Sequence, residues 1–303
     1  MMTTQTPSKL FSGLSAFPLT PTDAAGHLQA DVLCRFLENI QAAGANSIGL
    51  LGSTGGYAYL TRETRQRAVR VAVECVGAKI PIIVGVGALR TDEAEMLARD
   101  AKAARADGLL LAPMSYAPLT DEEVFQHFAA VATAGELPLC IYNNPSTTKF
   151  TFSDDLIARL ARLPNVAAVK MPLPANGNFA GEMERLRAMT PDGLAIGYSG
   201  DWGAADALLA GCDAWYSVVA GLLPAPALAL TRAAQAGNRP EVLRINEAFQ
   251  PLWDLFRAFG SFRVMYVMVD VLGLARIEPP RPILALPRET YGRVEAALQS
   301  LKS

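Results

Sequence analysis

The sequence predicts an α/β fold, a TIM (β/α)8 barrel with a C-terminal helical extension. Eight short apolar runs recur along residues 1–222, and segments with helical periodicity separate them. The length of 303 residues is typical of one such barrel with additions. Helical patterns continue after the eighth run. We therefore assign residues 1–222 to the barrel and residues 223–303 to a C-terminal helical region.

The eight runs are rich in aliphatic and β-branched residues, as expected of strands buried in a parallel sheet. In chain order they are SAFPL near Ala16, NSIGLL near Ile48, PIIVGV near Ile83, GLLLAP near Leu110, LPLCIY near Cys140, VAAVK near Val169, LAIGYS near Ile196 and DAWYSV near Tyr216. Each follows the previous one by about 20 to 35 residues, which leaves room for a helix between neighbouring strands.

The segments between the runs carry apolar residues at helical spacing. Two of them begin with a capping type of sequence at Thr61 and Thr91 and end near Gly77 and Gly108. Four further helices are expected at 225–236, 240–258, 261–273 and 288–301. An open doubly wound sheet is the alternative fold, but its glycine fingerprint is missing, because the first strand ends in FPLTP.

Composition and charge exclude several classes of protein. Apolar residues make up 51% and charged residues 18% of the chain, which excludes a disordered protein. The formal net charge is −2 without a basic block, so we expect no nucleic-acid partner. Pro224 and Pro226 interrupt the uncharged run 214–230, so we expect no membrane span. The first residues lack an apolar leader, which favours a cytoplasmic location.

The cysteines and histidines form no recognisable metal site. The four cysteines lie far apart without a CxxC pair, and we expect reduced, mostly buried thiols at Cys34, Cys75, Cys140 and Cys212. The two histidines, His27 and His127, occur in polar segments where we expect them to be exposed. A histidine-rich catalytic metal site cannot be assembled from them, so we expect no metal.

In a barrel of this kind, the side chains that do chemistry lie at the carboxyl ends of the strands. The second strand ends in Gly52-Ser53-Thr54-Gly55-Gly56, where glycines allow backbone N–H groups to converge beside two hydroxyls. This loop suits a carboxylate or a phosphate. A glycine-rich turn without any ligand has the same composition, so the motif alone leaves both interpretations open.

The fifth and sixth strands end in a phenol and an amine. Tyr142, in the motif YNNP, either relays protons at the barrel mouth or packs its ring and hydrogen-bonds its hydroxyl. Lys170 ends the apolar run VAAVK, where desolvation favours a neutral amine that can attack a carbonyl carbon. A lysine that reaches into solvent from the strand end is the alternative.

The seventh strand is followed by small residues, an acid and a large aromatic residue. Ser199, Gly200, Asp201 and Trp202 could line a substrate pocket, and we include Tyr216 of the eighth strand among the expected substrate contacts. Taken alone, Asp201 is more typical of a cap on the next helix.

A hydroxyl-rich loop, a phenol and an amine at strand ends are what a Schiff-base enzyme acting on a 2-oxo acid needs. At these motifs the sequence resembles the dihydrodipicolinate synthase/N-acetylneuraminate lyase family, and the likeness covers nearly the whole chain. GSTGG is similar to the family's GTTGE or GSTGE, YNNP to its YNxP, and Lys170 to its Schiff-base lysine. The segments FPLTP, GLLLAP, DAWYSV and RPILALP extend the likeness.

The resemblance implies that Lys170 forms an imine with the substrate and that Tyr142 donates and accepts protons. It implies that Ser53 and Thr54 bind the pyruvate carboxylate, with Ser53 also in the proton relay. Gly52, Gly55 and Thr147 are the further substrate contacts we expect. The imine itself replaces any cofactor, the substrates are a 2-oxo acid and an aldehyde, and the assembly is a homotetramer or homodimer.

The sequence departs from the family's synthases where they bind their second substrate. Thr147 stands where the synthases carry an arginine for the carboxylate of aspartate semialdehyde. Met114 and Ser115 replace two tyrosines, one of which joins the proton relay of a neighbouring subunit, and Tyr116 follows one position later. Gly56 and Trp202 replace acids. These departures predict negligible condensation with aspartate semialdehyde and a partner with a neutral, hydroxylated or aromatic far end.

The leading prediction is a class I, metal-independent lyase that acts on pyruvate or a longer 2-oxo acid by aldol cleavage, condensation or dehydration. One alternative is a dihydrodipicolinate synthase that condenses pyruvate with aspartate semialdehyde. Others are a non-catalytic pyruvate-binding homologue and a phosphate-handling isomerase or metal-dependent aldolase on the same barrel.

Overall fold

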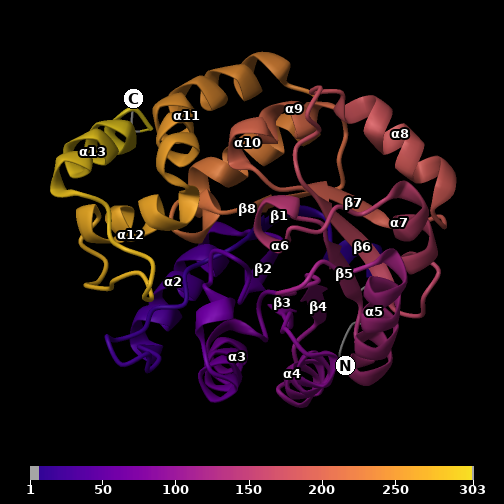
Figure 1. Cartoon of the computed structure of the whole chain (residues 1–303). Helices are drawn as coiled ribbons and strands as arrows, with labels where there is room; N and C mark the ends of the chain where they lie inside the picture. Colours follow the sequence, from indigo (N-terminus) through magenta and orange to yellow (C-terminus); the bar gives the residue numbers. More distant parts are fainter. Residues whose placement is uncertain (1–6, 302–303) are drawn as a thin grey trace.

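The computed structural model describes residues 7–301, and its centre is a closed barrel of eight parallel strands in the order β1 to β8 (Figure 1). The strands are β1 (Gly13–Ala16), β2 (Ser47–Leu50), β3 (Ile82–Gly85), β4 (Gly108–Leu111), β5 (Leu139–Tyr142), β6 (Val166–Met171), β7 (Ala195–Tyr198) and β8 (Ala214–Ser217). The barrel closes where Gly13 to Ala16 pair with Ala214 to Ser217. The predicted TIM barrel is therefore confirmed.

A helix covers the outside of the barrel after each strand. These helices are α2 (Ala30–Ala43), α3 (Arg62–Val76), α4 (Thr91–Ala103), α5 (Asp121–Gly135), α7 (Asp154–Leu160), α8 (Phe179–Met189), α9 (Ala204–Leu209) and α10 (Pro224–Gln235). The shorter elements are α1 (Pro7–Leu10), α6 (Pro145–Thr148), η1 (Tyr57–Tyr59), η2 (Asp201–Gly203) and η3 (Val219–Gly221). The long helices each bury one apolar stripe, as the periodicity predicts.

Local sequence explains where several helices begin and end. Thr61 accepts a hydrogen bond from the backbone N–H of Thr64 and caps α3, as predicted. The expectation for α4 is wrong at both ends. Thr91 is the first helical residue rather than the cap, and the helix stops at Ala103, before Arg105 takes a left-handed φ of 64°.

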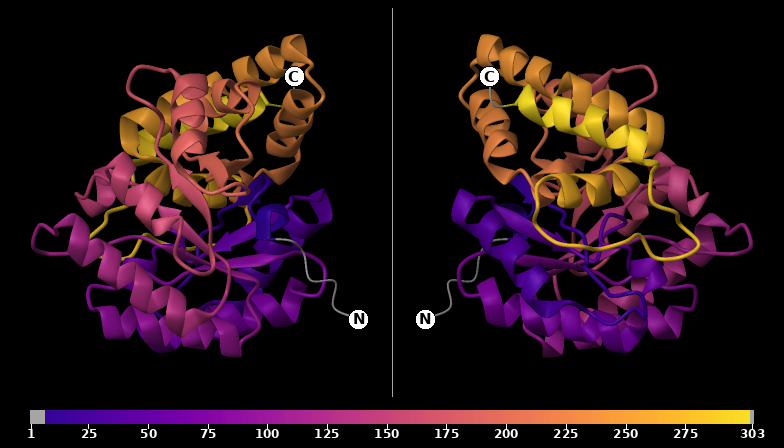
Figure 2. Two further views of the ribbon diagram at one scale, coloured as in Figure 1. Left: turned by 90° about the vertical axis from the view of Figure 1, so that its right-hand side faces the viewer. Right: turned by 90° about the vertical axis from the view of Figure 1, so that its left-hand side faces the viewer.

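The C-terminal extension consists of α11 (Arg239–Phe259), α12 (Ser261–Val271), η4 (Arg288–Thr290) and α13 (Tyr291–Gln299), close to the predicted bounds. These orange and yellow helices pack together beside the barrel (Figure 2). Their buried side chains join the same hydrophobic core as the outer faces of the strands. The predicted division after residue 222 falls just before α10, which packs against β1 and α2 and completes the ring of barrel helices.

The barrel interior is filled by alternate residues of the strands, because successive side chains of a strand point to opposite faces. The interior side chains include Phe17, Ile83, Leu110, Cys140, Ala168 and Tyr216. Leu10 and Phe11 close the amino-terminal end. A Cβ atom on Gly108 would lie 2.8 Å from Leu10 Cδ2, so glycine at the start of β4 makes room for this closure.

The predictions for the cysteines and the histidines are each wrong for some residues, although His27 is exposed as predicted. Cys34 and Cys75 form a disulfide between α2 and α3, since packing of these helices brings together cysteines that are 41 residues apart. Cys140 and Cys212 are free thiols. His127 is buried rather than exposed, because it lies on the inner side of α5, where its Nδ1 is 3.0 Å from Thr91 Oγ1.

Within residues 7–301, no helix is both long and apolar enough to cross a membrane.

The disulfide should contribute measurably to stability, because it limits the unfolded chain by closing a loop. We expect the double variant Cys34→Ser, Cys75→Ser to lower the free energy of unfolding by about 2 to 4 kcal/mol in non-reducing buffer. Urea denaturation measures the effect. Cys212→Ser, which removes a half-buried free thiol, is the matched control. Equal stability of the double variant and the wild type would contradict the Cys34–Cys75 disulfide as a source of stability.

Candidate active site

A cavity of about 740 Å³ opens at the carboxyl ends of the strands. It collects side chains from the loops after β2, β5, β6 and β7 and from the junction of α11 with α12. Ser53, Thr54, Tyr142, Thr147, Lys170, Ser199, Gly200, Asp201 and Trp202 of the predicted residues all line it. The tertiary structure therefore brings most of the predicted site into one cavity.

Lys170 is the most deeply buried basic group of this cavity, with 4% of its surface exposed. Its Nζ lies 3.9 Å from the ring centre of Phe17, 4.3 Å from that of Tyr142 and 5.6 Å from that of Tyr216. None of the described carboxylates forms an ion pair with it. The amine is thus held by aromatic faces and is open to the cavity, not neutralised by an acid.

Phe17 can lie against Lys170 because the two residues that its ring packs against, Gly49 and Gly52, have no side chain. A Cβ atom on Gly49 would lie 2.2 Å from Phe17 Cζ, and one on Gly52 would lie 2.5 Å from Phe17 Cδ1. The predicted substrate contact Gly52 does not line the cavity. Position 52 must instead be glycine because a larger side chain would clash with the ring of Phe17.

Tyr142 and Ser53 are joined by a hydrogen bond. Ser53 Oγ lies 3.1 Å from Tyr142 Oη, and Asn144 Nδ2 donates to the same phenol oxygen at 2.8 Å. The phenol oxygen therefore has two fixed neighbours at the mouth of the barrel. Asn144 was not among the predicted residues, although it belongs to the YNNP motif, because its side chain reaches back to Tyr142 only in the folded turn.

The loop after β2 contributes a second phenol. Thr54 is buried, Gly56 adopts a φ of 63°, and the chain then turns into η1, which places Tyr57 against the cavity. Burial and the neighbouring phenol of Tyr142 raise the pKa of Tyr57, so it stays protonated. The sequence analysis missed Tyr57. The predicted contact Gly55 does not line the cavity and packs against Leu51.

Asp201 links the end of β7 to the loop after β8. Its Oδ1 accepts hydrogen bonds from Trp215 Nε1 at 3.0 Å and Val218 N at 3.1 Å, and its Oδ2 accepts one from Val219 N at 2.7 Å. Burial raises its pKa to about 6, against these hydrogen bonds, which lower it. Asp201 therefore binds backbone N–H groups at the start of η3 after β8 and does not cap α9, whose N-cap residue is Gly203.

The remaining predicted contacts divide between the rim and the interior. Trp202 is 38% exposed at the rim, and Thr147 lies on exposed α6, where its hydroxyl donates to Asn144 O at 3.2 Å. Tyr216 does not line the cavity. It is buried below Lys170 because its position on β8 points into the barrel, where its ring packs at 86° against Phe17. Tyr116 is fully exposed and reaches none of these groups.

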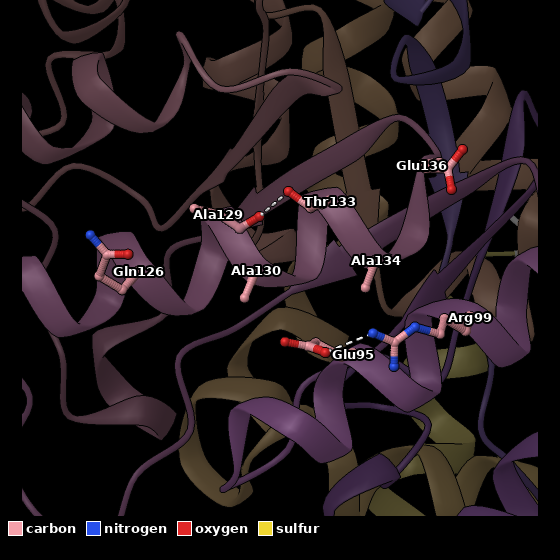
Figure 3. Close-up of a pocket in the computed structure, with 8 residues that line it drawn as sticks. All are labelled: Glu95, Arg99, Gln126, Ala129, Ala130, Thr133, Ala134 and Glu136. Atoms are coloured by element: carbon pink, nitrogen blue, oxygen red, sulfur yellow. Dashed lines mark hydrogen bonds and ion pairs between the residues drawn. The ribbon is translucent and has the colours of Figure 1, made fainter.

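A second hollow among the described residues has a lining without lysine, tyrosine or serine. Figure 3 shows this hollow between α4 and α5, with Glu95 and Arg99 paired at 2.7 Å beside Ala130 and Ala134. It lies outside the barrel, away from the carboxyl ends of the strands. Sγ of Cys34, Sγ of Cys75 and a carboxylate oxygen of Glu38 lie close enough for a metal, but the disulfide removes the two thiolates a metal would need.

Comparison with known proteins gives one consistent result. The chain matches the model of the Dihydrodipicolinate synthetase family over residues 10–301. A 4-hydroxy-tetrahydrodipicolinate synthase of Methylococcus capsulatus is 35% identical over 257 residues, which cover 83% of this chain and 86% of that protein. The enzyme of the same name from Pseudomonas putida is 30% identical over 291 residues, covering 96% and 98%.

Among solved structures, a dihydrodipicolinate synthase from Agrobacterium tumefaciens str. C58 is 57% identical to this chain. The alignment covers 98% of this chain and 100% of that one, with a TM-score of 0.96. A putative dihydrodipicolinate synthetase from Pseudomonas aeruginosa is 28% identical to this chain, with a TM-score of 0.89. The alignment covers 96% of this chain and 99% of that one.

The hydrogen bonds of Asp201 predict that the protein loses stability when this carboxylate is replaced by an uncharged amide. In Asp201→Asn an amide N–H would face a backbone or indole N–H, so we expect the free energy of unfolding to fall by about 1 to 3 kcal/mol, as measured by urea denaturation. Asp192→Asn, at an exposed loop position, is the control.

The same variant has a pH signature. Because the pKa of Asp201 is raised in the folded state, the unfolded chain releases this proton first, and the contribution of Asp201 to stability falls as pH rises from about 4 to about 6. The stability difference between wild type and Asp201→Asn should therefore narrow over this range. A difference that widens with pH would contradict this assignment.

Proposed function

This chain belongs to the dihydrodipicolinate synthetase family, and we propose that it is a lyase of that family that holds a 2-oxo acid as an imine on Lys170. One observation carries the proposal. Lys170 is a buried amine in an open cavity, without a carboxylate partner among the described residues, beside a phenol that is hydrogen-bonded to Ser53. Such an amine is suited to attack a carbonyl carbon.

The imine forms in two balanced steps. Lys170 Nζ attacks C2 of the 2-oxo acid, and the carbonyl oxygen becomes a hydroxyl by taking up a proton. A second proton then lets this hydroxyl leave as water, while the C=N bond forms. The hydroxyl of Ser53 and the backbone N–H groups of the loop after β2 would hold the carboxylate. Tyr142, within hydrogen-bond reach of Ser53, would supply and recover the protons.

The protonated imine then serves as an electron sink. In aldol cleavage Tyr142 takes the proton of the C4 hydroxyl, the C3–C4 bond breaks, and its electron pair moves to the imine nitrogen, which leaves an enamine and a free aldehyde. Protonation of the enamine at C3 and hydrolysis by water release the shorter 2-oxo acid and restore Lys170. Condensation is the reverse sequence. No cofactor or metal is needed for any of these steps.

A second candidate function is condensation of pyruvate with aspartate semialdehyde, because the related proteins are named as synthases of that type. We favour another aldehyde. Thr147 offers only a hydroxyl on the exposed helix α6, and this hydroxyl already donates to Asn144 O. It provides neither the charge nor the paired donors that a guanidinium offers to a carboxylate.

A homodimer or homotetramer is the assembly that the family resemblance implies. A cytoplasmic location stays a prediction of the sequence. Disulfides are rare in the cytoplasm. Whether Cys34 and Cys75 are oxidised or reduced in cells therefore tests the predicted location.

The imine can be trapped chemically. Incubation with pyruvate and borohydride should add the mass of a reduced pyruvyl group to Lys170, as located by peptide mass spectrometry. Lys149→Ala removes an exposed lysine near the cavity mouth and should still be labelled, whereas Lys170→Ala should not. Labelling at another lysine, or none in the wild type, would refute the assignment.

The hydroxyl of Tyr142 should affect the rate of turnover but not the folding of the protein. We expect Tyr142→Phe to slow turnover by about 10² to 10⁴, because the ring still packs while the proton-transfer group is lost. Tyr198→Phe is the matched control, since Tyr198 is a buried phenol at the end of strand β7 and donates to Glu182 outside the cavity. Equal rates for both variants would remove Tyr142 from the mechanism.

A further inference from the structure

We propose that the second reactant is an aldehyde whose far end is an uncharged aromatic group. This inference rests on the proposed function and specifies its substrate. The cavity of about 740 Å³ equals the volume of about 25 water molecules in the liquid, far more than a three-carbon 2-oxo acid fills. Apolar side chains form a large part of the cavity lining.

These side chains form an apolar wall, defined by Leu173, Trp202, Phe256 and Phe262, all of which line the cavity. Leu173 is fixed by close packing, because Cβ atoms on Gly200 and Gly203 would lie 2.8 and 2.6 Å from its side chain. Phe262 stands beside the loop after β2, 3.5 Å from where a Cβ of Gly56 would be. The apolar wall therefore includes residues from the loop after β6 and from the start of α12, beside the loop after β2.

Two helices outside the barrel ring supply part of the apolar wall. Phe256 lies near the end of α11 and Phe262 at the start of α12, where Gly260 separates the helices with a φ of 80°. Trp202 presents a large ring that is only partly covered. Aromatic rings around a partly open cavity favour a planar apolar ligand, which gains both burial and ring contacts.

Cations are lacking at this end of the cavity. Among the described residues that line it, Lys170 is the only lysine or arginine. Lys149 does not line the cavity, and its ammonium group donates at 2.8 Å to the backbone oxygen of Ser146, which does. Arg263 follows Phe262 without lining the cavity. The hydroxyls of Thr147 and Thr148 are both directed to Asn144 O. A carboxylate or phosphate at the far end would thus be desolvated without a charged partner.

The test compares three aldehydes as acceptors for pyruvate with the purified full-length protein: benzaldehyde, glyceraldehyde and aspartate semialdehyde. The 4-hydroxy-2-oxo acid or its cyclised product is measured by mass spectrometry. We expect kcat/KM for benzaldehyde to exceed that for each of the others by at least about tenfold. A higher kcat/KM for aspartate semialdehyde or glyceraldehyde would overturn the inference.

Variants locate the preference on the apolar wall. Trp202→Ala and Phe262→Ala should each reduce kcat/KM for benzaldehyde by about tenfold, and Phe259→Ala, a half-buried phenylalanine of α11 that does not line the cavity, is the matched control. Trp202→Arg should raise kcat/KM for aspartate semialdehyde by about tenfold, since it supplies the missing cation. Unchanged selectivity in all three wall variants would overturn the inference.

Borohydride trapping of pyruvate on Lys170 separates the two proposals. If Lys170 is labelled but the charged or hydroxylated aldehyde is preferred, the aromatic acceptor is wrong and the imine chemistry stands. If Lys170 is not labelled, the proposed function itself fails.

Discussion

The enclosure of one amine by aromatic rings is the constraint on which the rest of the site depends. An amine withdrawn from water must regain favourable contacts, and here the faces of Phe17, Tyr142 and Tyr216 provide them. The ring of Phe17 fits only because a side chain is absent at Gly49 and Gly52. Lys170 therefore stays buried and chemically available without an acid that would pair with it.

The remaining polar groups are arranged around that amine by the barrel. Parallel strands deliver their carboxyl ends to one face, so the loops after β2 and β5, which are far apart in the sequence, meet through the Ser53 and Tyr142 hydroxyls. Asp201 closes the other side by accepting three N–H donors from the end of β8 and the loop after it. Its carboxylate holds the frame of the site, whereas Lys170, Tyr142 and Ser53 are the groups to which we propose to assign the chemistry.

The C-terminal helices have a place in the site as well as in the core. Their apolar stripes pack into the hydrophobic core shared with the outer faces of the strands, and the junction of α11 with α12 carries Phe256 and Phe262 to the cavity. A barrel with the same catalytic strand ends but another extension would present a different surface to the second reactant. The extension thus contributes side chains both to the hydrophobic core and to the cavity lining.

The sequence by itself determined the barrel and the approximate bounds of the C-terminal helices, and it predicted Lys170, Tyr142 and Ser53 at the carboxyl ends of strands. Strand and helix periodicities are local properties, and each strand-end motif spans only a few consecutive residues. Only the tertiary structure decided the Cys34–Cys75 disulfide and the burial of His127. It likewise decided the hydrogen bonds of Asp201 to the region of β8 and the apolar wall at the cavity mouth.

The physical reason is the same in these cases. Each feature joins groups from different elements, and their distance depends on how helices pack on strands, a quantity that no local pattern encodes. Gly52 illustrates the point: its motif favours a ligand-binding loop, whereas the space it provides is taken by the ring of Phe17, which lies 35 positions earlier in the chain.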